Sequence, residues 1–157
     1  MPISDDRSAY ADHIRAASTG QLSDAMDRLG LPRGGCRSIL PVNVGDRLAG
    51  PAFTVLFGRI VDQSPLHDYL KGTPSGSVVV LAAGGSAECA VWGGRRSTTA
   101  AARGAVGTVI DGAVRDVEEH AAARYPVFAC GRSPLRSNGV IGPVSYTHLT
   151  LPTKRIV

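Results

Sequence analysis

Short apolar runs alternate along this chain with segments that carry apolar residues at helical spacing. The apolar runs predict buried strands, and the spacing i, i+3, i+4 and i+7 predicts helices. In chain order, the expected elements are a helix at 21–29, a strand at 48–58, a short helix starting at 64–65, a strand at 77–83, a helix at 97–103, a strand at 107–110, a helix at 116–124 and a strand at 126–130. This alternation predicts one α/β layered domain.

Residues 90–119 (AVWGGRRSTTAAARGAVGTVIDGAVRDVEE) bring glycines, an arginine and a carboxylate to the end of an apolar strand. We expect Asp111 and Gly112 to break that strand, and Asp116 to open the next helix. Arg115 and Asp116 would then lie where the carboxyl end of a strand meets the amino end of a helix. Open α/β sheets bind their ligands at such edges.

The side chains of Arg115 and Asp116 suit a small anionic ligand and a metal ion. The guanidinium group of Arg115 can hold a carboxylate through two parallel hydrogen bonds, and the hard oxygens of Asp116 suit Mg²⁺ or Mn²⁺. Backbone N–H groups at 94–96 could bind an anion at the start of a helix. A structural interpretation stays open, because Asp116 and Glu119 also form a capping-box pattern and Arg115 could pair with a surface carboxylate.

Three segments of the sequence resemble the RraA family, which contains the regulators of ribonuclease activity A and the class II 4-hydroxy-4-methyl-2-oxoglutarate aldolases. The segments are WGGRR, RGAVGTVIDGAVRDVEE and PVFACGRSP, and the resemblance extends back through STGQLSDAMDRLG and AGPAFTV. It covers about residues 18–143. It implies a swivelling β/β/α fold, usually assembled into homotrimers or hexamers with sites between subunits.

The resemblance also implies roles for individual residues. The usual mark of the family is an acidic residue, twenty intervening residues and then Arg-Asp, and this chain keeps that spacing. The implied substrate is a small 2-oxo acid and the implied cofactor a divalent cation, Mg²⁺ or Mn²⁺. The implied substrate-binding residues, which act through backbone amides, are Gly93, Gly94, Arg95 and Arg96. The implied catalytic residue, which also binds the oxo acid, is Arg115, and the implied metal ligand is Asp116.

The sequence departs from the family pattern at Gly94. The aldolases have an acidic residue at this position, thought to orient the water that moves protons, and a commonly apolar pair where this chain has Arg95 and Arg96. The departure somewhat favours an alternative function, that of a non-catalytic RraA-like regulator that binds a ribonuclease. A third class, a nucleotide or S-adenosylmethionine enzyme on a Rossmann-like sheet, needs a GxGxxG loop after the first strand, where this chain has only Gly58 and Arg59.

The lysine content bears on the type of reaction. Only Lys71 and Lys154 occur in the chain, and a Schiff-base aldolase needs a buried lysine with a lowered pKa. Any aldol chemistry is therefore expected to depend on a divalent metal. By the resemblance, we expect a lyase that cleaves 4-hydroxy-4-methyl-2-oxoglutarate to pyruvate by a retro-aldol reaction, with oxaloacetate decarboxylase activity beside it.

Composition and charge limit which partners and which cellular compartment we expect. No apolar run approaches the roughly 20 residues of a membrane helix, so we expect no membrane partner. Cys36, Cys89 and Cys130 show no CxxC pairing, which is typical of reduced thiols in the cytoplasm. Basic residues outnumber acidic ones by 17 to 13, and by 15 to 13 once Lys154 and Arg155 are left out. This excess is too small to indicate a nucleic-acid partner.

The last fourteen residues, 144–157, have a foreign composition. Within them, SYTHLTLPT matches the in-frame translation of the transposon-end adapter that is used to prepare sequencing libraries. We expect residues 1–143 to be an RraA-like domain that is truncated at its carboxyl end, and residues 144–157 to be a non-native tail. The alternative is a genuine short β tail.

Overall fold

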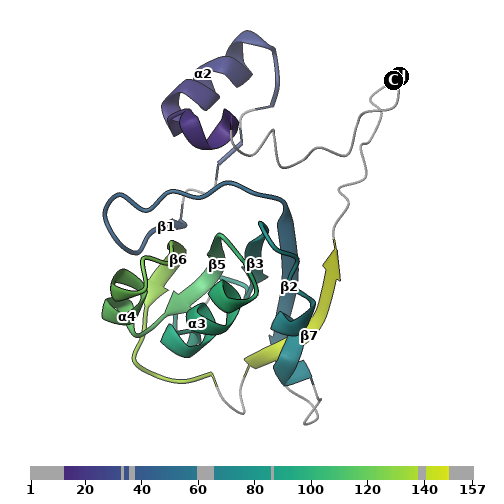
Figure 1. Cartoon of the computed structure of the whole chain (residues 1–157), viewed down its shortest axis with the longest axis vertical. Helices are drawn as coiled ribbons and strands as arrows, with labels where there is room; N and C mark the ends of the chain where they lie inside the picture. Colours follow the sequence, from purple (N-terminus) through teal and green to yellow (C-terminus); the bar gives the residue numbers. More distant parts are fainter. Residues whose placement is uncertain are drawn as a thin grey trace.

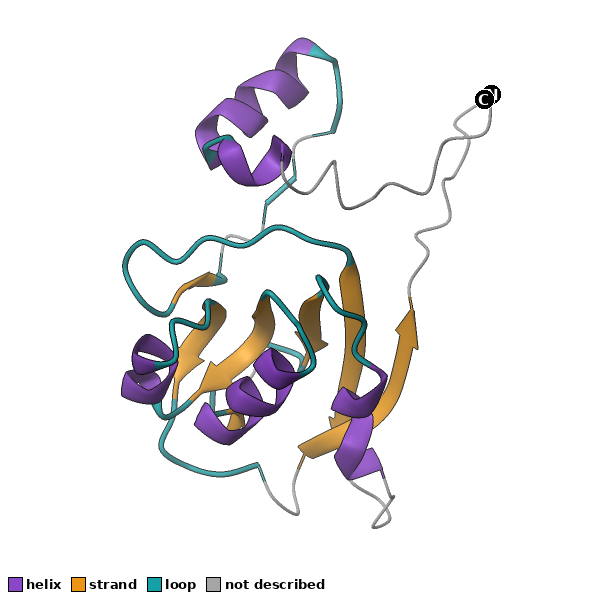
Figure 2. Cartoon of the chain, in the orientation of Figure 1, coloured by secondary structure: helices purple, strands orange, loops and turns teal. Residues whose placement is uncertain are grey.

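The computed structural model describes residues 13–32, 34–35, 38–59, 66–85, 87–137 and 141–148. Within these residues, a seven-stranded sheet forms the body of the structure, and α3 and α4 lie over one of its faces (Figures 1 and 2). The strands are β1 (Leu40–Pro41), β2 (Ala52–Arg59), β3 (Val78–Ala82), β4 (Ala90–Trp92), β5 (Gly107–Val114), β6 (Val127–Arg132) and β7 (Ile141–His148). The helices are α2 (Thr19–Arg28), the 3₁₀ helix η1 (Leu66–Gly72), α3 (Gly94–Ala102) and α4 (Val117–Ala122).

The centre of the sheet is parallel and its edges are antiparallel. The order is β1-β6-β5-β3-β2-β7, in which β6, β5, β3 and β2 run parallel to one another, while β1 is antiparallel to β6 and β7 is antiparallel to β2. Parallel strands are usually covered on both faces and carry continuous apolar runs. Val79, Leu81 and Ile110 are accordingly fully buried in the core. The predicted α/β layered fold is confirmed.

The short strand β4 extends the edge of β5 beyond the end of β3. β3 pairs with the first half of β5, up to Asp111, whereas β4 pairs in parallel with Ala113 and Val114. The predicted break at Asp111 and Gly112 is therefore wrong, because β5 continues through both residues. They coincide with a register shift against β6, so the chain accommodates them as a β-bulge rather than as a turn.

The other predicted elements occur with shifted ends. Helix α3 begins at Gly94 instead of residue 97, and α4 ends at Ala122, just before the predicted end. Strands β1 and β4 have only two and three residues, and the sequence pattern did not predict them. The expected start of a helix at 64–65 lies outside the described residues, which resume at η1.

Helix α2 stands apart from the sheet (Figure 1). It begins with the predicted Ser18 cap, which forms a capping box with Gln21. No residue of α2 is buried, and Leu29, at the end of its predicted apolar face, is 73% exposed. No helix among the described residues is long and apolar enough to cross a membrane.

Strand β7 and the cysteines bear on two further predictions. Strand β7 pairs with β2, so the predicted foreign tail begins inside a strand of the sheet, and its origin stays a prediction. Cys89 and Cys130 are free thiols, as predicted, and Cys36 lies outside the described residues.

Candidate active site

The carboxyl ends of β4 and β5 bring the predicted site residues together. Gly93 follows Trp92 at the end of β4, and Arg115 and Asp116 follow Val114 at the end of β5. Because the two strands are parallel neighbours, these ends meet at one edge. The backbone N–H of Arg115 donates a hydrogen bond to the carbonyl of Trp92 at 3.1 Å, which fixes the two ends against each other.

A pocket of about 320 Å³ opens at this edge. Five of the six predicted site residues line it, and the sixth, Gly94, contacts it through the hydrogen bond of its amide to Asp116. The complete lining is Ala90, Trp92, Gly93, Arg95, Arg96, Arg115, Asp116, Glu119, Arg136 and Ser137.

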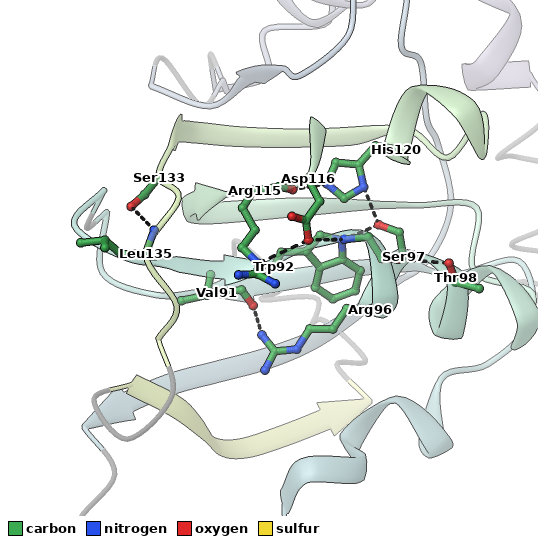
Figure 3. Close-up of polar contacts among 11 residues, drawn as sticks. Val91, Trp92, Arg96, Ser97, Thr98, Arg115, Asp116, His120, Ser133 and Leu135 are labelled. Atoms are coloured by element: carbon green, nitrogen blue, oxygen red, sulfur yellow. Dashed lines mark hydrogen bonds and ion pairs between the residues drawn. The ribbon is translucent and has the colours of Figure 1, made fainter. Parts of the chain in front are cut away.

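The carboxylate of Asp116 is held by two donors on one of its oxygens. Oδ2 accepts a hydrogen bond from the backbone N–H of Gly94 at 3.2 Å and lies 3.3 Å from Nε of Arg115 (Figure 3). Asp116 adopts a left-handed backbone conformation, with φ 57° and ψ 45°. Such a conformation costs a non-glycine residue about 1–3 kcal/mol, although aspartate tolerates it better than most. The left-handed backbone therefore directs this carboxylate toward the start of α3.

The capping-box interpretation of Asp116 and Glu119 is wrong. Asp116 occupies the N-cap position of α4, but its side chain makes no capping hydrogen bond to that helix. The left-handed backbone turns the carboxylate away from the α4 amides and toward Gly94. The pairing interpretation of Arg115 has support, because its Nε forms an ion pair with the carboxylate of Asp116, and both side chains are 30% exposed and line the pocket.

Gly93 leaves the space in which this carboxylate lies. A Cβ atom on Gly93 would lie 2.6 Å from Oδ2 of Asp116 and 3.2–3.3 Å from the Cγ and Nε atoms of Arg115. The backbone of Gly93 is extended, so a larger residue here is disfavoured by lack of space, since the side chains of Asp116 and Arg115 would have to shift, and not by its backbone conformation.

A buried chain of hydrogen bonds supports the same region from behind (Figure 3). The indole Nε1 of Trp92 lies 2.7 Å from Oγ of Ser97, which lies 3.0 Å from Nδ1 of His120. Nε2 of His120 lies 2.8 Å from the carbonyl oxygen of Arg115. The side chains of Trp92, Ser97 and His120 are all at least 99% buried.

The chemistry of these groups fixes which atom donates in each of the three hydrogen bonds. An indole N–H only donates and a carbonyl only accepts, so Nε2 of His120 carries the hydrogen and donates to Arg115. Nδ1 is then an acceptor for the hydroxyl of Ser97, which itself accepts from Trp92. Burial lowers the pKa of His120, and this outweighs the raising effects of the Arg115 carbonyl and of nearby carboxylates such as Asp116. His120 is thus neutral, and it holds the peptide that joins Arg115 to Asp116.

The side chain of Arg96 packs under the pocket. Its guanidinium donates to the carbonyl of Val91 and lies 5.6 Å from the ring centroid of Phe57. The backbone amides are also partly engaged, since Gly94 donates to Asp116 and Arg96 donates to the carbonyl of Gly93. Among the described residues, the amides of Gly93 and Arg95 are left to face an anion, and substrate binding by the 93–96 segment stays a prediction.

The pocket carries an excess of positive charge. Four arginines and two carboxylates line it, which favours a ligand with more than one negative charge. Sequence reasoning missed Arg136, which reaches the pocket because its segment forms a bridge to Ala90. This contact joins residues far apart in the chain, and no local pattern indicates it. Glu119 was considered only as a capping partner.

The donor set of the site fits magnesium or manganese and does not fit zinc. No group of three or more His, Cys, Asp or Glu side chains in the described ranges could hold a metal ion. Asp116 uses Oδ2 both for its hydrogen bond with Gly94 and for its ion pair with Arg115, so Oδ1 is left for a cation. Mg²⁺ often takes only one or two protein carboxylates and fills its other positions with water and substrate.

We expect Gly93→Ala to destabilise the protein by about 1–3 kcal/mol, because the added methyl group displaces the Asp116 carboxylate. Urea unfolding would measure the change. Gly35→Ala is the matched control, since a Cβ on Gly35 meets nothing within 4 Å. Equal midpoints for Gly93→Ala and the wild type would contradict the packing described here.

We expect the free energy of unfolding to fall as the pH drops below about 6.5. His120 in the unfolded chain takes up a proton near its ordinary pKa of 6.5, whereas the folded state resists protonation until a lower pH. The loss is at most about 1.4 kcal/mol for each pH unit and stops at the folded pKa. Urea unfolding at pH 7.5, 6.5 and 5.5 would measure it, with His120→Gln as the non-titrating reference. The same pH dependence in both proteins would contradict this assignment.

Comparisons with known proteins agree on one family. A family described as Aldolase/RraA matches residues 19–153. The chain is 37% identical over 118 residues to the protein DlpA of Legionella pneumophila, covering 73% of this chain and 19% of DlpA. It is 35% identical over 111 residues to a Burkholderia mallei protein provisionally named 4-hydroxy-4-methyl-2-oxoglutarate aldolase, covering 71% of this chain and 66% of that protein.

The fold agrees with this match. It superimposes on the crystal structure of an uncharacterized protein from Pseudomonas syringae pv. tomato with a TM-score of 0.80 and 34% sequence identity, over 93% of this chain and 68% of that chain. The chain thus spans about a fifth of the length of DlpA and about two thirds of the Burkholderia protein. From the match over residues 19–153 and these identities, the chain belongs to the Aldolase/RraA family.

Proposed function

We propose that the protein is a divalent-metal-dependent lyase that cleaves 4-hydroxy-4-methyl-2-oxoglutarate to pyruvate and also decarboxylates oxaloacetate. One observation carries the proposal. Arg115 and Asp116 lie side by side at the pocket, each with a polar group left over after their mutual contact. The name of the Burkholderia relative supports a lyase of this type.

Arg115 would bind the 2-oxo acid end of the substrate. Its Nε is engaged by Asp116, and its two terminal NH₂ groups have no partner among the residues that the structure describes. These two groups form a planar fork that matches a carboxylate. The pairing with Asp116 fixes the rotation of the guanidinium, so the fork is held in place before the substrate arrives.

Asp116 would hold the metal ion through Oδ1. A divalent cation there would supply Lewis-acid stabilisation of the negative charge that develops on the oxo oxygen when the carbon–carbon bond breaks. The chain's own contribution is the aim of the carboxylate, which the Gly94 amide and Nε of Arg115 fix together. No lysine among the described residues lines the pocket, and Lys71 is exposed at the end of η1, which supports a mechanism without a Schiff base.

Arg95 and Arg136 would bind the second carboxylate of the substrate. Neither guanidinium has a partner in the part of the chain that the structure describes, and both line the pocket. Both proposed substrates are dicarboxylates. The excess of two positive charges among the lining side chains, together with the proposed divalent cation, would favour such a dianion.

We expect pyruvate release from both substrates in the presence of Mg²⁺ and its loss in EDTA. Arg115→Ala should lower kcat/KM by about 100-fold or more, and Arg115→Lys nearly as much, because lysine lacks the fork. Arg103→Ala removes an exposed arginine outside the pocket and is the matched control. A coupled lactate dehydrogenase assay would measure pyruvate.

Two results would overturn this function. Full activity in EDTA would exclude the metal, and substantial activity in Arg115→Ala would exclude the proposed substrate contact. A folded protein that releases no pyruvate from either substrate would favour a regulator that binds a ribonuclease without chemistry, which an inhibition assay with that nuclease would test.

We expect Arg136→Ala to raise the KM for oxaloacetate about 5- to 30-fold and to change kcat little. The reason is that a charge-assisted hydrogen bond to the distal carboxylate is worth about 1–2 kcal/mol. Initial rates over a range of oxaloacetate concentrations would measure it, with Arg103→Ala again as the control. An unchanged KM would remove Arg136 from the binding site.

A further inference from the structure

The carboxylate of Glu119 fills the space in which a side chain at position 94 would lie. A Cβ atom on Gly94 would overlap Oε2 of Glu119 and would lie 2.6 Å from its Cδ and 2.9 Å from its Cβ. Glu119 lies one turn after Asp116 on α4, and Gly94 is the first residue of α3. Glu119 therefore reaches across from one helix to the other and lines the pocket beside Asp116.

We propose that Glu119 is the group that carries the proton in the retro-aldol reaction. The inference rests on the proposed function and adds a catalytic residue that the sequence pattern did not indicate. It also accounts for Gly94. The glycine leaves the room that Glu119 occupies, so the pocket has an acidic group at this place although position 94 has none.

Glu119 is better suited to this task than Asp116. One oxygen of Asp116 is taken up by Gly94 and Arg115. The carboxylate of Glu119 makes no hydrogen bond or ion pair with any residue in the described ranges. It is also exposed to the pocket's solvent, so both of its oxygens can accept a proton.

The other polar residues of the pocket are poor candidates. Arginine stays protonated in proteins and cannot act as a base. His120 is fully buried and does not line the pocket, and both of its nitrogens are engaged by Ser97 and Arg115. Among the described lining residues, Glu119 is the carboxylate with no internal partner.

A single carboxylate can both remove and return the one proton that the retro-aldol reaction moves. Glu119 takes the proton from the C4 hydroxyl, the C3–C4 bond breaks, and C4 becomes the carbonyl carbon of the first pyruvate. The electron pair of the broken bond forms the enolate of the second pyruvate. The protonated Glu119 then returns the proton to C3, so that no other acid or base is consumed and one substrate gives two pyruvates.

Decarboxylation of oxaloacetate makes a different demand. The C3–C4 bond breaks with loss of CO₂, and no hydroxyl proton has to be removed. Only C3 needs a proton, which water can supply. The proposal therefore predicts that the loss of Glu119 affects the two reactions unequally.

The test compares Glu119→Gln with the wild type on both substrates. For 4-hydroxy-4-methyl-2-oxoglutarate, kcat should fall about 100-fold or more with KM within a few-fold, as for the loss of a general base. Oxaloacetate decarboxylation should fall by less than about 10-fold, because its bond cleavage needs no general base. Glu118→Gln changes the exposed neighbour that does not line the pocket and should change neither reaction.

A second variant places the carboxylate on the other helix. Gly94→Glu combined with Glu119→Gly puts an acid into the vacated space, because glycine also removes the Cβ atom that would lie 2.9 Å from a Cβ at position 94. The double variant should recover at least about 10-fold of the retro-aldol rate lost in Glu119→Gly, a part of the general-base contribution. Exchange of solvent deuterium into the methyl group of pyruvate, followed by NMR, measures the proton transfer at C3 alone. Its rate should change in parallel with the retro-aldol rate of each variant.

The outcomes separate this inference from the proposed function. A wild-type protein without metal-dependent pyruvate release overturns both. If the wild type is active, an unchanged Glu119→Gln overturns the role of Glu119 alone. An equal loss of both reactions in Glu119→Gln also overturns it, because a merely structural role would produce that result.

Discussion

The hydrogen bond between the backbone N–H of Arg115 and the carbonyl of Trp92 is the contact on which the site depends. It ties the end of β5 to the end of β4, and β4 has no other partner strand among the described residues. Eight of the ten residues that line the pocket belong to β4 or follow one of these two ends, and the other two, Arg136 and Ser137, come from the segment after β6. Helix α3 starts directly after β4, and α4 starts directly after β5.

The site is rigid because its groups hold one another from two sides. On the pocket side, Gly94 and Arg115 restrain the carboxylate of Asp116. On the core side, His120 restrains the carbonyl of Arg115, and every member of that buried chain has a partner. A buried polar network that is fully satisfied strengthens a single arrangement of the backbone. The left-handed residue Asp116 is thus held by this network and by the amides of Glu119 and His120 in α4, which donate to its carbonyl.

Much of the fold could be predicted from the sequence, because its central strands are apolar runs that alternate with helical segments, whereas the ends of α3 and α4 were predicted less well. The position of Arg115 and Asp116 at a strand's carboxyl end followed from the same pattern. β4 could not be predicted, since three residues show no period. The Asp-Gly pair at 111–112 was misleading, because a bulge and a turn share this composition. Arg136 and Glu119 reach the pocket through tertiary contacts alone, which no local spacing reports.

The left-handed backbone of Asp116 has a consequence for which amino acids this position can accept. Glycine, asparagine and aspartate are the residues that adopt this conformation readily. Of these, only aspartate has a carboxylate. Glutamate has the charge but not the backbone preference, and its longer chain would not end at the amide of Gly94. Backbone geometry and charge therefore restrict the position independently, and the two restrictions leave a single amino acid in common.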